Sequence, residues 1–404
     1  MMKRVFCVFL FFAVFCCDCL ADDNLTINTI AYGIEGAASV AVDINNTPVV
    51  VSRNYLQDLV FITQTPNGYE TNSIPQTSNS RYPRLKVTSN NELALSFLKD
   101  GGVWYGSKSD WFDWVFSQVE DSSVMVADMV LTDNDIPHIV YDYQKWIYHS
   151  FYDVHSQQWV KEQLSGFGNH TFRTAAIDID SEGRIMISCS EEGNVRTAIY
   201  LDGFWNYLPL LQGYGADGSF TADNLSAVAF ERSDQLIYAV YINDIIGWVE
   251  NVVGPASLPI TIPVSLAHSL TGVPGIAYID NDDSKLMYAT NVSGGWTTTQ
   301  INEVCKYPEL IFDHNDKPLI VYTNYDSCVD KPVIKLAGIG LEGFNIADLN
   351  NDKIVNFRDF AILADYWLTV LPEPDLTIGD FDQNAKIDAL DIKWLSCNWL
   401  WRGE

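Results

Sequence analysis

The sequence predicts a mainly β protein, a seven-bladed β-propeller, followed by a small all-α module. The first observation is a hairpin pattern that occurs seven times between residues 26 and 337, at intervals of about 40 to 50 residues. The second is a change of pattern near the C-terminus, where short apolar strands give way to apolar segments with helical spacing. The chain has 404 residues, of which 48% are hydrophobic, and this is enough to bury a core in both parts.

Each hairpin consists of a short apolar strand, a turn rich in Asp, Asn and Gly, and a second apolar strand. Asp, Asn and Gly favour such turns because they adopt turn conformations readily. We expect the first strands at residues 40–43, 85–88, 126–131, 175–178, 227–230, 264–267 and 308–312. Their partners are expected at residues 49–52, 93–97, 138–141, 185–188, 236–241, 275–279 and 319–322.

Two further strands follow most hairpins, often with an aromatic residue near the end, which gives four antiparallel strands per unit. The seventh unit lacks an outer strand, since its third strand is expected at residues 333–336. Residues 25–31 precede the first hairpin and can supply that strand. Such a closure joins the first and last units and removes sheet edges that would otherwise pair with other chains.

The first 21 residues have the pattern of a secretory signal peptide, with a positively charged start, an apolar run and small residues before Asp22. The apolar run is too short to span a bilayer. We therefore expect an exported protein, extracellular or on the cell surface, with its propeller at residues 22–337. The alternative is a lipoprotein in which Cys16 or Cys17 is acylated.

The formal net charge of −28 limits the partners of the chain. Nucleic acid is not an expected partner, because phosphate binding needs clustered Lys and Arg. Anionic membrane surfaces are disfavoured for the same reason. An acidic chain does attract cations such as Ca²⁺.

Four cysteines remain after the predicted signal peptide. Cys305 and Cys328 flank a predicted strand pair, and they can form a disulfide in an oxidising compartment. Cys189 lies in an apolar strand and Cys397 in a predicted helix, where we expect both to be buried as small apolar residues. No spacing of Cys and His indicates zinc.

Two segments near the C-terminus carry oxygen-bearing residues at the spacing of a calcium-binding loop. Such a loop needs side-chain oxygens at positions 1, 3, 5, 9 and 12 and a backbone carbonyl at position 7. The first loop supplies Asp348, Asn350, Asp352, Ile354 (through its carbonyl), Asn356 and Asp359. The second supplies Asp380, Asp382, Asn384, Lys386 (through its carbonyl), Asp388 and Asp391. Because the complete set occurs twice in register, we expect two bound Ca²⁺ ions.

Each loop leads into an apolar segment with helical spacing, which begins near Phe357 in the first copy and near Leu390 in the second. This duplicated loop and helix, with Asp at position 12, resembles the type I dockerin. The resemblance implies attachment to a cohesin-like or other cell-surface protein. Glycines mark a short linker at residues 338–344, and the dockerin-like module then occupies residues 345–404.

The module departs from the dockerin pattern in two respects. Position 6 of the loop favours Gly because the chain turns sharply there, but this position is Lys353 in the first loop and Ala385 in the second. The helix positions where dockerins often carry Ser-Thr are residues 357–358 and 389–390 here. The first departure predicts weaker calcium binding, and the second leaves the identity of the partner open.

The strand order places the start of each first strand at one face of the ring, around a central mouth where a concave site is expected. Residues 81–84, 170–173 and 306–309 lie there and mix Arg, Tyr, His and carboxylates, which can hold a sugar. Among them, Tyr82, His170 and Arg173 are the candidate catalytic residues of a polysaccharide lyase. A structural role is the competing interpretation, since these residue types also shape turns and strand entries.

His138 and His149 are a second candidate pair, but we expect His138 at the opposite face and His149 in the middle of a strand. The repeat is broadly similar to the BNR-like propellers of carbohydrate-active and carbohydrate-binding proteins. Three functions remain open: a recognition module for extracellular carbohydrate or protein, a polysaccharide lyase or glycoside hydrolase with its site at the central mouth, and a structural protein of the cell envelope.

Overall fold

The computed structural model describes residues 25–402 apart from a set of short segments. The segments left out are 33–35, 55, 66–67, 111–112, 122–123, 169, 257–263, 281–283, 328–330, 346, 372–378 and 382–385. The predicted signal peptide therefore lies outside the described residues. Within the described part of the chain, no helix is long and apolar enough to cross a membrane.

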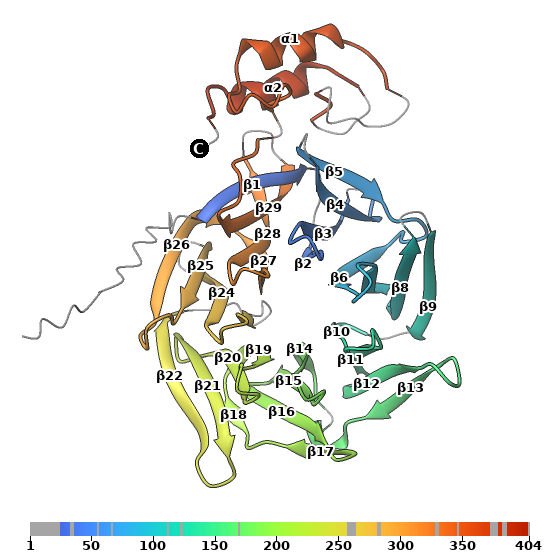
Figure 1. The fold of residues 1–404 in the computed structure, drawn as a ribbon, viewed down its shortest axis with the longest axis vertical. Coiled ribbons are helices and arrows are strands. Elements are labelled where there is room, and N and C mark those ends of the chain that lie inside the picture. The colour runs from blue at the N-terminus through green and yellow to red at the C-terminus, as the bar shows by residue number, and fades with distance from the viewer. Residues whose placement is uncertain are drawn as a thin grey trace, which may run out of the picture.

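Seven antiparallel β-sheets stand side by side around a central axis, and each forms one blade of a propeller (Figure 1). In blades 1 to 6 the strands follow one another in chain order from the axis outward. The predicted seven-bladed β-propeller is thus confirmed.

The first three blades each contain four strands. Blade 1 contains β2 (Ser39–Val42), β3 (Pro48–Arg53), β4 (Leu59–Thr65) and β5 (Gly68–Ser73). Blade 2 contains β6 (Ser80–Val87), β7 (Leu93–Lys99), β8 (Gly102–Asp110) and β9 (Asp113–Glu120). Blade 3 contains β10 (Ala127–Leu131), β11 (Pro137–Tyr143), β12 (Trp146–Asp153) and β13 (Gln158–Gln163), followed by the short 3₁₀ helix η1 (Ser165–Phe167).

The next three blades repeat this order, and blade 4 has one additional short strand. Blade 4 contains β14 (Phe172–Ile179), β15 (Ile185–Glu191), β16 (Asn194–Leu201), β17 (Phe204–Tyr207) and β18 (Leu211–Gln212). Blade 5 contains β19 (Tyr214–Phe220), β20 (Ser226–Arg232), β21 (Gln235–Asn243) and β22 (Gly247–Pro255). Blade 6 contains β23 (Ser265–His268), β24 (Pro274–Asp280), β25 (Lys285–Thr290) and β26 (Thr297–Val304).

Blade 7 closes the ring with strands from both ends of the propeller. It contains β27 (Lys306–Phe312), β28 (Pro318–Asp326), β29 (Lys331–Ile339) and, as its outer strand, β1 (Leu25–Tyr32). The strand β1 pairs antiparallel with β29, from Leu25 opposite Ile339 to Tyr32 opposite Val333. The predicted closure by the N-terminal strand is therefore confirmed.

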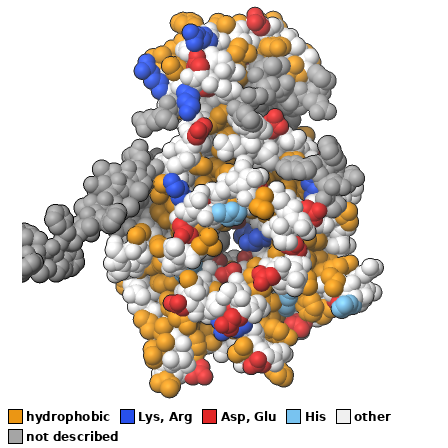
Figure 2. Space-filling model, viewed as in Figure 1, with side chains coloured by type: hydrophobic (Ala, Val, Ile, Leu, Met, Phe, Trp, Pro, Cys, Tyr) orange, Lys and Arg blue, Asp and Glu red, His pale blue; other side chains and the backbone are white. Residues whose placement is uncertain are grey.

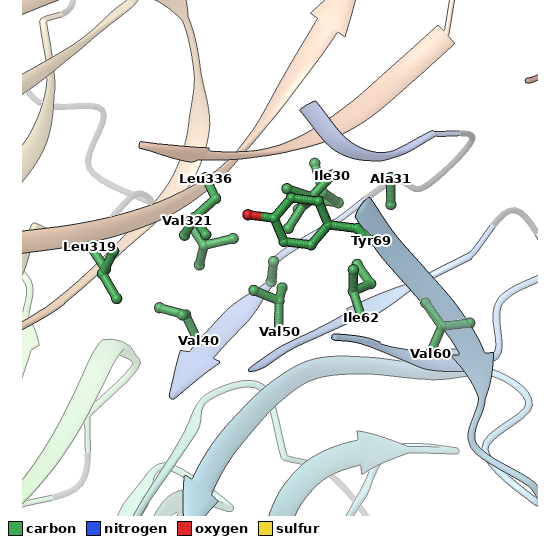
Figure 3. Packing of buried hydrophobic residues seen from close by; sticks show 12 residues of the cluster. Ile30, Ala31, Val40, Val50, Val60, Ile62, Tyr69, Leu319, Val321 and Leu336 are labelled. Carbon is green, nitrogen blue, oxygen red and sulfur yellow. The ribbon is translucent and has the colours of Figure 1, made fainter. Parts of the chain in front are cut away.

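Apolar side chains fill the spaces between neighbouring blades. At the closure, Ile30 of β1 lies with Val50 of blade 1 and Val321 of blade 7 in one buried cluster around the ring of Tyr69 (Figure 3). Each of the three aliphatic side chains is at most 1% exposed. Burial of this kind stabilises a fold by roughly 1.5–3 kcal/mol per large aliphatic side chain. The closure is therefore held by a shared core as well as by strand pairing.

The turns between the inner and second strands share one geometry in all seven blades. The first residue is Asp, Thr or Ser, and its side-chain oxygen accepts a hydrogen bond from the backbone N–H four residues later. The fourth residue is Asn, Asp or Gly and has a positive φ, which these residue types tolerate best. The turns start at Asp43, Thr88, Thr132, Asp180, Thr221, Ser269 and Asp313.

One predicted hairpin is assigned to the wrong pair of strands. Residues 227–230 and 236–241 form β20 and β21, the second and third strands of blade 5, whereas the inner strand is β19. The strand β19 contains Gly215, Asp217 and Gly218, so it lacks the apolar run that marks the other inner strands. The other six hairpins lie where they were predicted.

The C-terminal module contains two helices, α1 (Phe357–Asp365) and α2 (Ala389–Cys397), and it lies outside the ring beside β1 and β5 (Figure 1). Its own core includes Leu363 of α1 and Trp394 of α2, both at most 1% exposed. The predicted loop-and-helix repeat is confirmed for the described residues. Val333 of β29 belongs to the same cluster, so the module packs against the propeller.

The segment between the two domains is held by hydrogen bonds to β1. The Asn28 side chain donates to the Glu342 carbonyl at 2.9 Å and accepts from the Phe344 N–H at 2.9 Å. The Phe344 ring contacts the Tyr69 ring edge to face, with centroids 5.1 Å apart. Asn28 is itself buried. The short linker expected here therefore follows a fixed path along the propeller.

The cysteines differ in part from expectation. Cys189 is buried as a thiol in β15, as predicted. Cys305 is also a buried thiol, which does not support the proposed pairing with Cys328, a residue outside the described part of the chain. Cys397 is disulfide-bonded, so the expectation that it acts only as a buried apolar residue is wrong.

Candidate functional sites

A central channel of about 710 Å³ runs between the inner strands of the blades. Figure 2 shows the hollow at the centre of the ring, with basic and acidic side chains around it. The charged residues that line it come from five blades: Arg84, Lys86, Asp128, Arg173, Asp178, Asp217, Lys306 and Glu309. Both signs of charge therefore line the channel.

Four of these charged residues, Arg84, Asp128, Asp217 and Glu309, occupy one position of the repeat, four residues before the start of the turn. We call the seven residues at this position the inner ring: Ser39, Arg84, Asp128, Ala176, Asp217, Ser265 and Glu309. Five of them accept a hydrogen bond from a backbone N–H of the next blade, at 2.7–3.2 Å. These bonds join blade 1 to blade 2, blade 3 to blade 4, blade 5 to blade 6, blade 6 to blade 7, and blade 7 to blade 1. The inner ring therefore ties neighbouring blades together.

Arg84 joins two inner-ring carboxylates across the channel. Its Nε donates to Asp128 at 3.1 Å, and its Nη1 donates to Glu309 at 3.0 Å. Burial lowers the pKa of Arg84, but the attraction of Glu309, Asp128 and Asp217 outweighs it and raises the pKa above the usual value. Arg84 therefore stays charged and holds blades 2, 3 and 7 in register.

Asp217 is an inner-ring carboxyl with a raised pKa. Burial raises its pKa to about 7, the Leu266 N–H opposes this shift, and the nearby Asp128 carboxylate adds to it. Its two oxygens accept from the Leu266 N–H at 2.7 Å and from its neighbour Gly218 N–H at 2.9 Å. A carboxyl with such a pKa in a channel is a candidate acid or base, but here the backbone contacts already account for its position.

The three predicted catalytic residues do not all meet. Tyr82 and Arg173 both line the channel, on blades 2 and 4. His170 does not line it, and its Nδ1 faces Glu191 at 3.5 Å instead. The structure therefore brings Tyr82 and Arg173 to the channel and His170 to Glu191.

The two other predicted histidines form a chain of contacts away from the channel. His138 Nδ1 lies 2.9 Å from His149 Nε2, and His149 Nδ1 lies 3.3 Å from Glu162. Burial lowers the pKa of His138 to about 3, and the neighbouring His149 adds to this shift. His138 lies at the start of β11 and His149 in the middle of β12, as expected, and the pairing of Val140 with His149 places His149 diagonally opposite His138. The pair packs against Phe151 and Trp205 rather than around the channel.

The first calcium loop has the backbone that its ligand spacing predicts. Asp348 accepts hydrogen bonds from the N–H groups of Asp352 at 3.1 Å and Lys353 at 2.7 Å. Asp359 is fully buried and accepts from the N–H groups of Asn350 and Asn356. The loop therefore wraps around the oxygens of positions 1 and 12.

Burial raises the pKa of Asp348, and the carboxylates of Asp359 and Asp352 add to this shift. Such crowding of carboxylates is what a bound divalent cation relieves. Lys353 has φ of 64°, the left-handed conformation that favours Gly at position 6. The loop thus keeps the calcium-loop turn at this position although a side chain is present.

The second loop repeats these features in the residues that are described. Asp380 and Asp391 are fully buried, and Asp391 accepts from the N–H groups of Phe381 and Asp388 at 2.7 and 2.8 Å. Asp388 caps α2 as Asn356 caps α1, each in a reciprocal pair with the acid three residues later. Asp382 and Asn384 lie outside the described residues.

The oxygens of both loops fit Ca²⁺, which prefers carboxylate, amide and carbonyl oxygen. Among the described residues, His, Cys, Asp and Glu alone form no cluster of three that could hold a metal. The first loop also places the side-chain amides of Asn350 and Asn356 at positions 3 and 9. With calcium bound, Asp348, Asp352 and Asp359 would supply charge and the Ile354 carbonyl a neutral ligand.

Comparison with known proteins supports both domains. Residues 346–397 match the family model of the dockerin type I domain. The virginiamycin B lyase of Staphylococcus aureus is similar in structure, with a TM-score of 0.53 at 10% identity over 78% of this chain and 99% of that one. The protein YCF48, bound to a D1 peptide, has a TM-score of 0.51 at 13% identity over 79% of this chain and 96% of that one. No curated protein matches the chain. At this identity the structural neighbours show the propeller fold alone, while residues 346–397 carry a dockerin type I module.

Proposed function

We propose that this chain is an exported recognition protein whose propeller binds an extracellular ligand and whose dockerin module attaches it to a partner protein when calcium is bound. The observation that carries the proposal is the dockerin module, in which both loops present buried carboxylates at positions 1 and 12. Two Ca²⁺ ions, a cohesin-like or other cell-surface partner and an extracellular location follow from it.

The propeller supports the recognition part of the proposal. At the end of the channel where the inner strands start, its lining includes Tyr82, Tyr307, Arg173 and Lys306. Concave sites of this size, with few polar groups in fixed positions, are where small ligands bind. The fixed path of the interdomain segment holds this face in a constant orientation to the attached partner.

Calorimetry on the full chain tests the calcium part. After removal of metal with a chelator, titration with Ca²⁺ should show uptake of two ions, and Asp359→Asn should reduce the number to one. Immobilised cohesin domains should retain the chain in Ca²⁺ and release it in chelator. Absence of calcium uptake by the native chain would overturn the attachment role.

A further inference from the structure

A second pocket of about 420 Å³ lies at the channel mouth, over blades 7, 1 and 2. We call it the Tyr-Pro pocket, because Tyr82 and Tyr307, each followed by Pro, form part of its wall and also border the channel. The remaining wall includes Arg53, Arg81, Lys306 and Tyr325. Its volume falls in the range of about 300–1,000 Å³ that is usual for small-molecule sites.

The two tyrosines are held at strained backbone positions. Tyr82 has φ of 51° and Tyr307 has φ of 52°. Each lies within a β-bulge of the same kind, because the pairing of the inner strand shifts between Arg81 and Arg84 in blade 2 and between Lys306 and Glu309 in blade 7. Non-glycine residues adopt this conformation at a cost of about 1–3 kcal/mol.

Blade 5 shows what the fold alone requires at this position. The same shift occurs there between Tyr214 and Asp217, and the corresponding residue is Gly215, with φ of 62°. Glycine satisfies the bulge without strain. The bulge therefore does not explain why blades 2 and 7 carry tyrosine there. Residues that are unfavourable for the local backbone conformation are expected at functional sites.

The ring brings these two bulges together although they are far apart in the sequence. The rings of Tyr82 and Tyr307 meet edge to face, with centroids 6.3 Å apart. Gly36 and Ala37 line the pocket between them, and their small size leaves the space open. The aromatic wall is therefore assembled from blades 2 and 7 on either side of blade 1.

The Tyr-Pro pocket is lined by basic side chains although the chain as a whole is acidic. The chain has 52 acidic and 24 basic residues, yet the lining holds Arg53, Arg81 and Lys306 and no Asp or Glu among the described residues. Arg81 and Lys306 are exposed, and the Arg81 guanidinium lies 5.7 Å from the centre of the Tyr82 ring. In the channel, by contrast, Arg84 is neutralised by two carboxylates.

We propose that the Tyr-Pro pocket binds an acidic saccharide, with a uronic acid carboxylate on Arg81 and Lys306 and the sugar ring against the tyrosines. Arginine and lysine recognise carboxylates through charge-assisted hydrogen bonds, and tyrosine offers an apolar face with a polar edge. The volume of about 420 Å³ suits one or two sugar units. The inference rests on the proposed recognition role of the propeller and names its ligand class.

Calorimetric titration of the full chain in Ca²⁺ with a galacturonic acid tetramer tests the inference. The native chain should bind it, more weakly at high salt because exposed charges are screened. The double variant Arg81→Ala with Lys306→Ala should lose about tenfold or more in affinity, since two charge contacts are removed. Lys145→Ala is the matched control, an exposed cation at a turn between second and third strands of the same face, and it should bind as the native chain does.

Tyr307→Gly provides a second variant that does not depend on charge. Glycine keeps the left-handed backbone, so the melting temperature should hold or rise while binding weakens. Equal affinity in the double variant and the native chain would overturn the assignment of the pocket. Poly-glutamate binding that depends on Arg81 and Lys306, without tetramer binding, would show an acidic peptide site and overturn the saccharide class. If the native chain takes up calcium and binds cohesin but no acidic saccharide, only this inference fails.

Discussion

The substitution Ser39→Ala should lower the stability of the fold strongly, although it removes only one oxygen atom. Ser39 is fully buried, and its hydroxyl accepts from the Leu85 N–H of blade 2 at 2.9 Å and donates to Glu309 of blade 7 at 2.6 Å. Ser39→Ala leaves the buried Leu85 N–H without an acceptor, which costs about 1–3 kcal/mol. It also removes a hydrogen bond to a charged group, worth about 1.5–3 kcal/mol.

The expected loss for Ser39→Ala is therefore about 2–5 kcal/mol, because Glu309 keeps its bonds to Val40 and Arg84. With an unfolding entropy of about 2.1 cal/mol/K per residue and roughly 300 residues, the melting temperature should fall by about 3–8 °C. Differential scanning calorimetry in Ca²⁺ measures this fall. The matched control is Ser226→Ala, a buried serine whose hydroxyl has no hydrogen-bond partner. It should change the melting temperature little, and equal shifts in the two variants would refute the proposed role of the inner ring.

Three further predictions concern the module, its docking and the channel. In Asp359→Asn, α1 should lose part of its N-terminal cap, an interaction that stabilises a helix by about 1 kcal/mol. Circular dichroism in Ca²⁺ should therefore show less helix than in the native chain. Phe344→Ala removes the ring that packs on Tyr69, so limited proteolysis should cut the segment before the module faster while the propeller melts as before; unchanged cleavage would contradict the fixed path. Asp217 has a folded pKa of about 7, above the usual 3.8, so its ionisation disfavours the folded state. Stability should fall as the pH rises from 4 through 7, and Asp217→Asn should flatten this slope in melting curves recorded from pH 4 to 8; an unchanged slope would assign it to other groups.

Local sequence signals were sufficient for most of the propeller. Six hairpins were predicted correctly because their turns combine a capping Asp, Thr or Ser with Asn, Asp or Gly in the left-handed position, and apolar strands follow on both sides. The fifth failed because β19 carries Gly215, Asp217 and Gly218, which serve the bulge and the inner ring rather than the core. Because these residues of β19 serve the channel, the strand lacks the apolar pattern that identifies strands in a sequence.

The inner ring was missed for a different reason. A polar residue four positions before the turn recurs in six of the seven blades, and this spacing is visible in the sequence. The role of this position is not visible, because four of these side chains bond to a backbone group 45–49 residues away in the next blade, as Asp128 does to Ile177.

The calcium loops, unlike the inner ring, could be predicted from the sequence, because all their ligands fall within twelve residues and the spacing alone defines the site. What the sequence could not supply is the placement of the module, which depends on the meeting of Asn28 and Phe344 across more than 300 residues.

The closure of the ring explains why the interdomain segment and the Tyr-Pro pocket both lie near the junction of blades 7 and 1. Pairing of β1 with β29 brings the chain's start to blade 7, where Asn28 fixes the segment that leads into the module. The same closure sets blade 7 beside blade 1, and only then do Tyr82 and Tyr307 meet. A propeller closed at another blade boundary would retain its core, but it would separate attachment from the Tyr-Pro pocket. The position of the closure therefore couples the orientation of the binding face to the partner on which the module is anchored.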